Sequence, residues 1–570
     1  MNKYKSFTKE QLIAKIKQLE SKKYGLVWDS EKEPEKVVLE CQNNIPILKK
    51  IDDKTIQTDK NKPNNILIEG DNYHALQVLN YTHKGQIDVI YIDPPYNTGN
   101  KDFKYNDSFV DKEDGYRHSK WLNFMSKRLK LAHNLLKDSG VIFISIDDNE
   151  MAQLKLLCDD IFGEDNFINS ITIMSNPRGR QSSKHFAETH EYGLVYAKNV
   201  KNITINGEEL TESQIKEYNK KDEYGNYREI GLRLRGGRST AEESPTLHFP
   251  LYVHRKNKQI FIEETDNCVE IIPKFENGTL GTWRWSKLKI KKDIAYLIAR
   301  EVKRGDKKEF DIFQKDYLLE DKTRKVKTTW IEKEINYDQS SREQIELFNE
   351  KIFAYAKPLY LLRKISGILA NKESVILDFF AGSGTTGHAI LDLNQDGGNR
   401  QFILCTNNEN DICTDVTYPR LSKVINGYTT PKGVAVGGLG GNLDYYKTDL
   451  VPTDGISNIS DTTREELTNK AGNMIAIKEN THTMLEFNEH YQIFQNETTS
   501  KQTAIYFTED LSHFNELIEK VKAYKIKLYI FSFGKIDKSS YKYLGKNFEI
   551  EDIPEPIIEI YKEINKEGVL

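Results

Sequence analysis

The chain has 570 residues, which is too long for a single hydrophobic core, so we expect two to four domains. Hydrophobic residues make up 38% of the sequence and aromatic residues 11%, which supports packed cores and excludes a wholly disordered chain. The formal net charge of -4 is a sum over the whole chain, so it neither indicates nor excludes nucleic-acid binding, which depends on local basic patches.

The cysteines and the start of the chain indicate where the protein resides. No CxxC pair occurs, which argues against a structural zinc site or any other metal site of this kind. Residues 1–20 predict an amphipathic helix without the apolar segment of a signal peptide. No stretch approaches the roughly 18 uncharged apolar residues that span a bilayer. We therefore expect a soluble intracellular protein with reduced thiols and no membrane contact; the five cysteines are Cys41, Cys158, Cys268, Cys405 and Cys413.

Strands and helices alternate through the first part of the chain. Apolar strands are predicted at 65–69, 87–92 and 141–146, and amphipathic helices at 74–84 and 121–138. This alternation is typical of a parallel, doubly wound sheet.

The alternation stops at about residue 170 and resumes near residue 356. A strand (374–380) then runs into a glycine-rich turn and a helix, and a further strand follows at 401–406. We therefore expect a sheet that is interrupted by a long insertion. The last 125 or so residues (446–570) predict a small β-α-β unit and a closing helix.

The turn GSGTTG after the strand ending at Phe380 indicates a cofactor site. Its glycines (Gly382, Gly384 and Gly387) allow a tight turn and close approach of a ligand to the backbone, beside the N–H groups that begin a helix. A P-loop is excluded because it needs a lysine in this turn. The spacing also fits a dinucleotide site, with Glu409 as the ribose acid. The turn alone therefore predicts an adenosine-bearing cofactor or an ordinary βα turn.

The sequence Asp93-Pro94-Pro95-Tyr96 ends a predicted strand, where ligands bind in open α/β sheets. The two prolines fix the backbone and supply carbonyls but no N–H donors. Two acceptors beside an aromatic ring suit a planar group with an exocyclic NH2. The competing interpretation is a capped turn with Tyr96 packed against the protein.

DPPY followed much later by FAGSGTT resembles the β-class amino-methyltransferases that use S-adenosylmethionine, in which the catalytic motif precedes the cofactor motif. The likeness extends to ILIEGDNYHAL, FKYNDSF, RHSKWLNFMSKRL, GVIFISIDDNE, HEYGLVYAKN, KPLYLLRKI, FILCTNNEN and IPEPIIEIYKEI. This set resembles the modification (Mod) subunit of type III restriction–modification systems over nearly the whole chain.

The resemblance implies a circularly permuted, doubly wound, mostly parallel Rossmann-like methyltransferase sheet, interrupted by a target-recognition domain and followed by a small α/β domain. It implies an N-terminal helical segment (1–60), a catalytic half (61–170), the insertion (171–355), a cofactor half (356–445) and a C-terminal domain for dimer or partner contacts (446–570).

It further implies DNA adenine N6-methylation, with Asp93, Pro94, Pro95 and Tyr96 receiving a flipped-out adenine. The residues that it places at S-adenosylmethionine are Asp71, Lys357, Asp378, Phe379, Ala381, Gly382, Ser383, Gly384, Thr385 and Glu409. Asp71 could instead cap a helix, Glu409 could be a solvated loop acid, and Lys357 could be a surface lysine.

Basic segments in the insertion predict contacts with double-stranded DNA, since arginines read guanine edges and lysines hold phosphates. Solvated charged faces are the alternative for each of them. The residues are Arg178, Arg180, Arg235, Arg238, Arg284, Lys287 and Lys325.

The resemblance also implies a homodimer in the bacterial cytoplasm that works with a separate ATP-dependent restriction (Res) subunit, because this chain has no Walker A motif. The alternatives are a solitary DNA adenine methyltransferase, a DNA-binding specificity subunit with incidental methylation, and a cytosine N4-methyltransferase. An RNA methyltransferase and an NAD-dependent enzyme are more distant alternatives, and the latter leaves DPPY unexplained.

Overall fold

The computed structural model describes residues 33–179, 185–304, 307–455 and 459–569, together with positions 8, 9, 12, 13, 16 and 28. Most of the expected N-terminal helix, and Arg180, lie outside the described residues. The chain forms two compact units, one from residues 1–206 with 327–570 and the other from Gly207–Val326.

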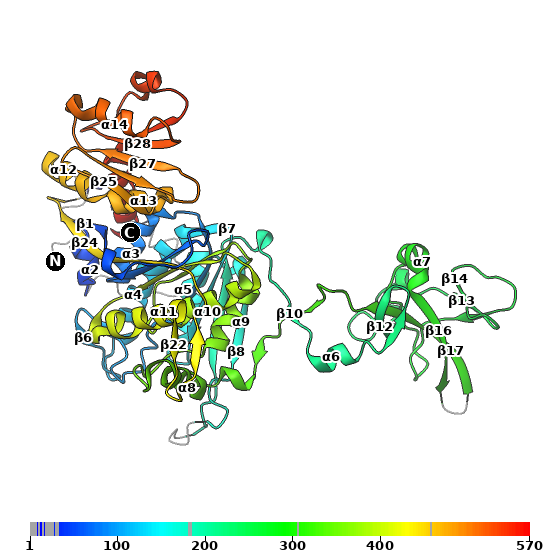
Figure 1. Ribbon diagram of the computed structural model, residues 1–570. Coiled ribbons are helices and arrows are strands. Elements are labelled where there is room, and N and C mark those ends of the chain that lie inside the picture. The colour runs from blue at the N-terminus through cyan, green and yellow to red at the C-terminus, as the bar shows by residue number, and fades with distance from the viewer. Residues whose placement is uncertain are drawn as a thin grey trace. The chain divides into compact units, whose positions relative to one another are not determined.

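One large sheet organises the larger unit (Figure 1). Its six central strands, from β24 to β7, run parallel, whereas β1 and β9 flank them in the antiparallel direction. Short strand β2 (Ile56–Gln57) pairs with β24 outside this order. In spatial order the strands are β1 (Asn44–Lys50), β24 (Asn442–Pro452), β3 (Asn64–Glu69), β21 (Gln401–Thr406), β20 (Val375–Asp378), β4 (Ile87–Ile92), β7 (Leu136–Ile146), β9 (Glu191–Ala197), β8 (Phe167–Ile173) and β19 (Thr329–Trp330).

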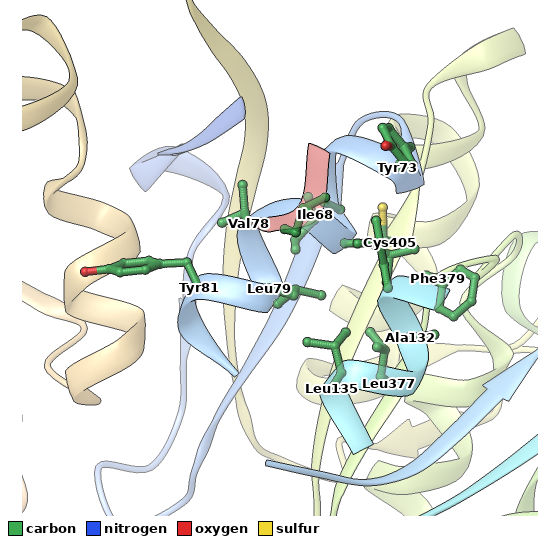
Figure 2. Close-up of a cluster of buried hydrophobic side chains, with 14 of the residues drawn as sticks. Ile68, Tyr73, Val78, Leu79, Tyr81, Ala132, Leu135, Leu377, Phe379 and Cys405 are labelled. Atoms are coloured by element: carbon green, nitrogen blue, oxygen red, sulfur yellow. The ribbon is translucent and has the colours of Figure 1, made fainter. Parts of the chain in front are cut away.

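The central strands are apolar on both faces because helices cover both sides of the sheet. In β3, Ile66 and Ile68 belong to one hydrophobic cluster, and Leu67 between them belongs to another. The first cluster contains α3 (Asn72–Thr82), α4 (Arg117–Leu135) and α5 (Met151–Phe162). Figure 2 shows part of this cluster, including Leu79 of α3, Ala132 of α4 and Leu377 of β20. The second cluster contains α10 (Thr385–Leu393) and α11 (Tyr418–Asn426). The doubly wound, mostly parallel fold predicted from the sequence is confirmed.

The order of the strands fixes where a ligand can bind. β4 and β20 are neighbours, with Ile376 opposite Val89 and Leu377 opposite Ile90. From β4 the chain passes through α4 to β7 on one side, and from β20 it passes through α10 to β21 on the other. The strand order therefore reverses between β4 and β20, and in open α/β sheets the ligand crevice lies at this point.

The smaller unit has its own core around Trp283, Leu232 and Ile312. It contains two short helices, α6 (Glu212–Lys216) and α7 (Lys287–Asp293), and three small antiparallel sheets. The largest sheet has the order β11 (Lys220–Asp222), β12 (Gly225–Gly231), β17 (Lys307–Tyr317) and β16 (Leu297–Arg304).

This unit is shorter than the expected insertion of 171–355. β8 and β9 extend the large sheet beside β7, and β19 extends it beside β8, so the segments on both sides of Gly207–Val326 belong to the larger unit. At the other end, β24 continues to Pro452, past the expected boundary at 445. These edge strands pair without the strand–helix alternation on which the expected boundaries were based.

The C-terminal part of the larger unit contains the β-α-β arrangement expected from the sequence. β27 (Gln502–Tyr506) and β28 (Ile526–Phe531) are parallel and are joined through α14 (Phe514–Val521). The sheet continues with β29 (Phe548–Ile553) on one side and with β26 (Tyr491–Gln495) and β25 (Thr483–Phe487) on the other. Helices α13 (Gly472–Glu479) and α15 (Glu555–Val569) contact α3. Of the helices in the described ranges, none is long and apolar enough to cross a membrane.

Candidate active site

The Asp93–Tyr96 corner begins where buried strand β4 ends. Pro94 is buried, and the indole N–H of fully buried Trp121 in α4 donates to the carbonyl of Pro95 at 2.7 Å. Because a proline ring fixes each φ and a core residue holds the second carbonyl, the corner is rigid.

The side chains of the corner meet a buried lysine. Lys357 Nζ donates to Tyr96 Oη at 2.6 Å and to Glu191 Oε2 at 2.8 Å, and it lies 3.2 Å from Asp93 Oδ1. It also donates to Tyr337 Oη at 2.9 Å. Both tyrosine hydroxyls donate to the same oxygen of Glu191. Lys357 is 7% exposed, so the surface-lysine alternative is wrong.

Burial and charge act in opposite directions in this network. Burial raises the pKa of Asp93 above its usual value, and the Lys357 ammonium opposes this shift without cancelling it. Burial would lower the pKa of Lys357, but Asp93 and Glu191 raise it well above its usual range. Lys357 is therefore a permanent cation at neutral pH.

Residues after the corner are also fixed. Asn97 is buried with a φ of +58°, and its amide donates to Glu150 Oε1 at 2.5 Å. The hydroxyl and the N–H of Thr98 donate to the carboxylate of Asp102 at 2.9 and 3.0 Å. The turn Asn97-Thr98-Gly99 thus holds the chain as it leaves the corner.

The glycine turn starts from Asp378, the last residue of β20. Its carboxyl group accepts hydrogen bonds from Phe380 N at 3.0 Å and from Thr386 Oγ1 at 2.5 Å. Asp378 is buried, and burial raises its pKa to about 7 despite these bonds. Asp378 therefore links the start of the turn at Phe380 to the first turn of α10 at Thr386.

Two glycines of the turn adopt the left-handed conformation that other residues avoid: φ is +48° at Gly382 and +75° at Gly384. A Cβ on Gly384 would lie 3.0 Å from the Thr417 side chain, whose hydroxyl donates to the carbonyl of Gly382 at 2.6 Å. Gly387 has a different role. It lies inside α10, where a Cβ would be 2.7 Å from Leu421.

Fully buried Arg420 of α11 holds the glycine turn by hydrogen bonds. Its guanidinium donates to Ser383 Oγ at 3.1 Å, to the carbonyl of Ser383 at 3.4 Å and to Thr385 Oγ1. Burial lowers its pKa to about 10, so it remains charged at neutral pH. Arg420 thus holds both hydroxyls in place, and these two hydroxyls also lie 3.1 Å from each other.

Asp71 caps α3, since its carboxylate accepts from Tyr73 N at 2.7 Å. Its side chain is still 40% exposed, which leaves one side open to a ligand. The next residue, Asn72, donates to the carbonyl of Phe379 at 3.0 Å. The β3–α3 turn and the glycine turn are thus joined directly.

Glu409 follows β21 and is 42% exposed, with an ion pair to Lys104, the first residue of short strand β5 (Lys104–Tyr105). Buried Phe379 and Ala381 complete the set from the sequence. The structure thus places Asp71, Asp93, Phe379 and Glu409 after four neighbouring parallel strands, β3, β4, β20 and β21.

Sequence reasoning missed Glu191, Tyr337 and Arg420. Glu191 begins β9, and because β9 is antiparallel, its start lies at the same edge as the ends of the parallel strands. An acid directly before the apolar run of β9 was the available signal. Tyr337 and Arg420 come from segments that carried no recognisable pattern.

The predicted DNA contacts divide between the two units. Arg178 belongs to the larger unit and is exposed. Those in the smaller unit are also exposed, and one of them, Arg284, donates to the carbonyl of Gly231 at 3.1 Å. They are Arg235, Arg238, Arg284, Lys287 and Lys325.

Comparison with known proteins gives the following matches. Residues 87–416 match the DNA methylase family. The chain is 35% identical over 390 residues to the type III restriction-modification enzyme EcoPI Mod subunit of Escherichia phage P1, covering 63% of this chain and 60% of that one. It is 37% identical over 352 residues to the type II methyltransferase M.KpnI of Klebsiella pneumoniae, covering 61% and 82%. The solved M1.HpyAVI–SAM complex matches with a TM-score of 0.27 and 15% identity over 63% of this chain and 98% of that one.

The family match covers more than half of the chain and includes both the Asp93–Tyr96 corner and the glycine turn. The chain spans about 60% of the length of the EcoPI Mod subunit. Because the family model matches the chain across both motifs, this chain belongs to the DNA methylase family.

Proposed function

We propose that this chain transfers the methyl group of S-adenosylmethionine to the exocyclic N6 of an adenine in DNA. The observation that carries the proposal is the pairing of β4 with β20, because it brings the Asp93–Tyr96 corner and the glycine turn to one edge of the sheet.

The glycine turn fits the cofactor. Its left-handed glycines carry no side chain, and the turn ends at the N-terminus of α10, where the first N–H groups have no partner within the helix. Ala381 to Thr385 would hold the methionine end through backbone groups, with Asp378 and Phe379 shaping the turn. Glu409 and Asp71 would contact the ribose and the adenine. S-adenosylmethionine supplies an electrophilic sulfonium methyl group when bound.

The corner fits an aromatic amine. The lone pair of the adenine N6 is delocalised into the ring, so the amine is a weak nucleophile. Asp93 and the Pro94 carbonyl would accept hydrogen bonds from the NH2 group and so favour a more tetrahedral nitrogen. Asp93 would also stabilise the positive charge that develops on this nitrogen, an interaction strongest in the transition state.

The adenine has to leave the duplex to reach this corner, at a cost of about a few kcal/mol. Stacking on Tyr96 offsets part of that energy. The Tyr96 hydroxyl is bonded to Lys357 and Glu191, so the orientation of the ring is fixed before a base arrives. A rigid ring loses little entropy when the base stacks on it.

The family resemblance and the similarity to the EcoPI Mod subunit support the wider role of a type III modification subunit. In that role the smaller unit would recognise the target, with its exposed arginines and lysines contacting double-stranded DNA. A second copy of the chain and a separate ATP-dependent restriction subunit would be its partners. In the methyltransferase families that this chain resembles, a DPPY motif favours adenine and an SPPY motif favours cytosine N4, so we propose adenine as the methylated base.

The test is transfer of labelled methyl groups from S-adenosylmethionine to unmethylated genomic DNA by the unaltered chain and by Asp93→Ala. We expect the unaltered chain to label the DNA and Asp93→Ala to lose at least a hundredfold in rate while still binding the cofactor. Equal labelling by both proteins would show that Asp93 takes no part in the reaction.

A further inference from the structure

Lys357 lies between two carboxylates, the partly exposed Asp93 of the DPPY motif and the buried Glu191 outside it. Its ammonium nitrogen is 2.8 Å from Glu191 Oε2 and 3.2 Å from Asp93 Oδ1. Glu191 is 2% exposed and Lys357 7% exposed. Removing ionised groups from water to this extent is unfavourable unless each is matched by an opposite charge.

The three charged groups do not balance. Two carboxylates and one ammonium leave a single negative charge, and the hydroxyls of Tyr96 and Tyr337 stay protonated because burial raises the pKa of both. Glu191 Oε1 is buried and has no hydrogen-bond partner within the described part of the chain. The group formed by Asp93, Glu191 and Lys357 therefore has a net charge of one negative unit when all three are ionised.

We propose that Glu191 is a positioning residue that cancels the charge of Lys357, so that the negative charge of Asp93 remains for the amine that becomes methylated. This inference rests on the proposed function and extends it to a residue outside the motif. Without Glu191, Lys357 would neutralise Asp93 and the corner would offer no net charge to the reaction.

The reaction supplies the missing positive charge. The nitrogen lone pair forms a bond to the methyl carbon while the carbon–sulfur bond breaks and its electron pair remains on sulfur. Positive charge moves onto N6 and is lost when N6 releases a proton, for which Asp93 is the adjoining acceptor. The negative charge of the corner thus stabilises the transition state, in which N6 carries positive charge, more than it stabilises the neutral amine.

The test is a double-mutant cycle on the full chain with Glu191→Gln, Lys357→Met and the two together, measuring the single-turnover methylation rate. We expect Glu191→Gln to slow methylation at least tenfold, because it leaves Asp93 paired with Lys357. Lys357→Met should be equally slow at pH 7, because two adjoining carboxylates share a proton, and should recover as the pH rises. The double variant restores one negative charge and should be faster than either single variant.

The pH readout involves the ionisable groups that face this lysine among the described residues. These are Asp93 and Tyr96 after β4, Glu191 on β9 and Tyr337, the first residue of α8 (Tyr337–Phe348). Asp378 and Tyr91 interact in turn with Asp93. Lys357→Met removes the only cation from this set, so its rate should rise with pH where that of the unaltered chain is flat.

A matched control is Glu479→Gln in α13. Glu479 is also a buried carboxylate, bonded to Lys501 at 2.9 Å and to Tyr529 at 2.7 Å, but it lies outside the candidate active site. Glu479→Gln should methylate at the unaltered rate, and cofactor binding measured by calorimetry should be the same for Glu479→Gln, Glu191→Gln and the unaltered chain.

The outcomes separate the two proposals. If the unaltered chain methylates no nucleic acid, the proposed function fails. If it methylates DNA and Glu191→Gln keeps its rate, or the two single effects simply add, the role of Glu191 is contradicted. Should the single variants fail to fold, the double variant still decides, because an active double variant supports the inference and a folded, inactive one overturns it.

Discussion

Asp378 shows how burial sets the behaviour of a single side chain. In the unfolded chain it ionises near pH 3.8, whereas in the folded chain burial keeps it protonated until about pH 7. The folded state therefore holds an extra proton between these values, and the free energy of unfolding falls as the pH rises through 7. Asp378→Asn lacks this dependence. We expect its stability relative to the unaltered chain to increase by about 1 kcal/mol between pH 6 and pH 8, measured by urea denaturation.

A constant difference between the two proteins over that pH range would show that Asp378 is ionised in the folded chain. The hydrogen bonds from Phe380 N and Thr386 Oγ1 would then outweigh the effect of burial.

The buried pair of Arg128 and Glu35 is a second case at this scale. Arg128 Nη2 and Nη1 donate to the two oxygens of Glu35 at 2.8 and 3.1 Å, and both residues are buried. Among the described residues, Glu35→Gln leaves Asp71, at 3.5 Å, as the remaining carboxylate near the guanidinium. We expect a loss of about 3 kcal/mol in unfolding free energy, and a smaller loss in Glu35→Gln with Arg128→Met, because that variant buries no unpaired charge. Equal losses in the two proteins would argue against a buried ion pair here.

Sequence could locate Asp93, Tyr96 and the glycine turn because each lies at a recognisable strand end. It could not place Lys357, since a lysine in a loop carries no periodicity, and its burial depends on Glu191, which is 166 residues away along the chain. Nor could it show that Asp71 caps α3 and borders the proposed cofactor site at the same time.

At the scale of elements, the contact of α10 with α11 and the sheet depends on Gly387. A methyl group there would lie 2.7 Å from Leu421 and 3.0 Å from Leu404, both of which are buried. We expect Gly387→Ala to destabilise the fold by about 1–2 kcal/mol, despite the higher helix propensity of alanine, because the core is overpacked.

Gly367 in α9 (Leu359–Leu369) is the matched control, because open space surrounds the position that its Cβ would occupy. Gly367→Ala should stabilise the fold by about 0.5–1 kcal/mol. Urea denaturation of both variants checks the pair, and destabilisation of similar size in both would show that crowding at α11 is not the cause.

Elements with a regular repeat were predictable and the sheet edges were not. β3, β4, β20 and β21 are apolar runs followed by helices, which is the pattern of βαβ units. β9 pairs with β7 on one side and with β8 on the other, and the described residues between β8 and β9 form no helix, so the sequence pattern assigns these two strands to the insertion. Two-residue β19 has too little sequence to predict.

At the scale of the whole molecule, the two units differ in what they should contribute. Residues 207–326 have their own core, so replacing them with a Gly-Ser linker should leave the large sheet intact. We expect that deletion to bind S-adenosylmethionine with unchanged affinity and to lose binding to duplex DNA. Retained DNA affinity in a gel-shift assay would place recognition outside this unit.

Removal of residues 453–570 should have the opposite effect. α13 and α15 contribute to the same hydrophobic cluster as α3, and Tyr561 donates to the carbonyl of Pro46 at 2.5 Å. Truncation would expose this cluster to water, so we expect an aggregating protein without a cooperative unfolding transition in calorimetry. A soluble, cofactor-binding truncation would show that the C-terminal part is an independent domain.

The most direct test of the central claim is the identity of the methylated base. Unmethylated DNA would be incubated with the chain and S-adenosylmethionine, digested to nucleosides and analysed by mass spectrometry, beside a parallel reaction with Asp93→Ala. The expected product is N6-methyladenine, present with the unaltered chain and absent with the variant. N4-methylcytosine would contradict the choice of adenine, and no methylated nucleoside would contradict the proposed activity.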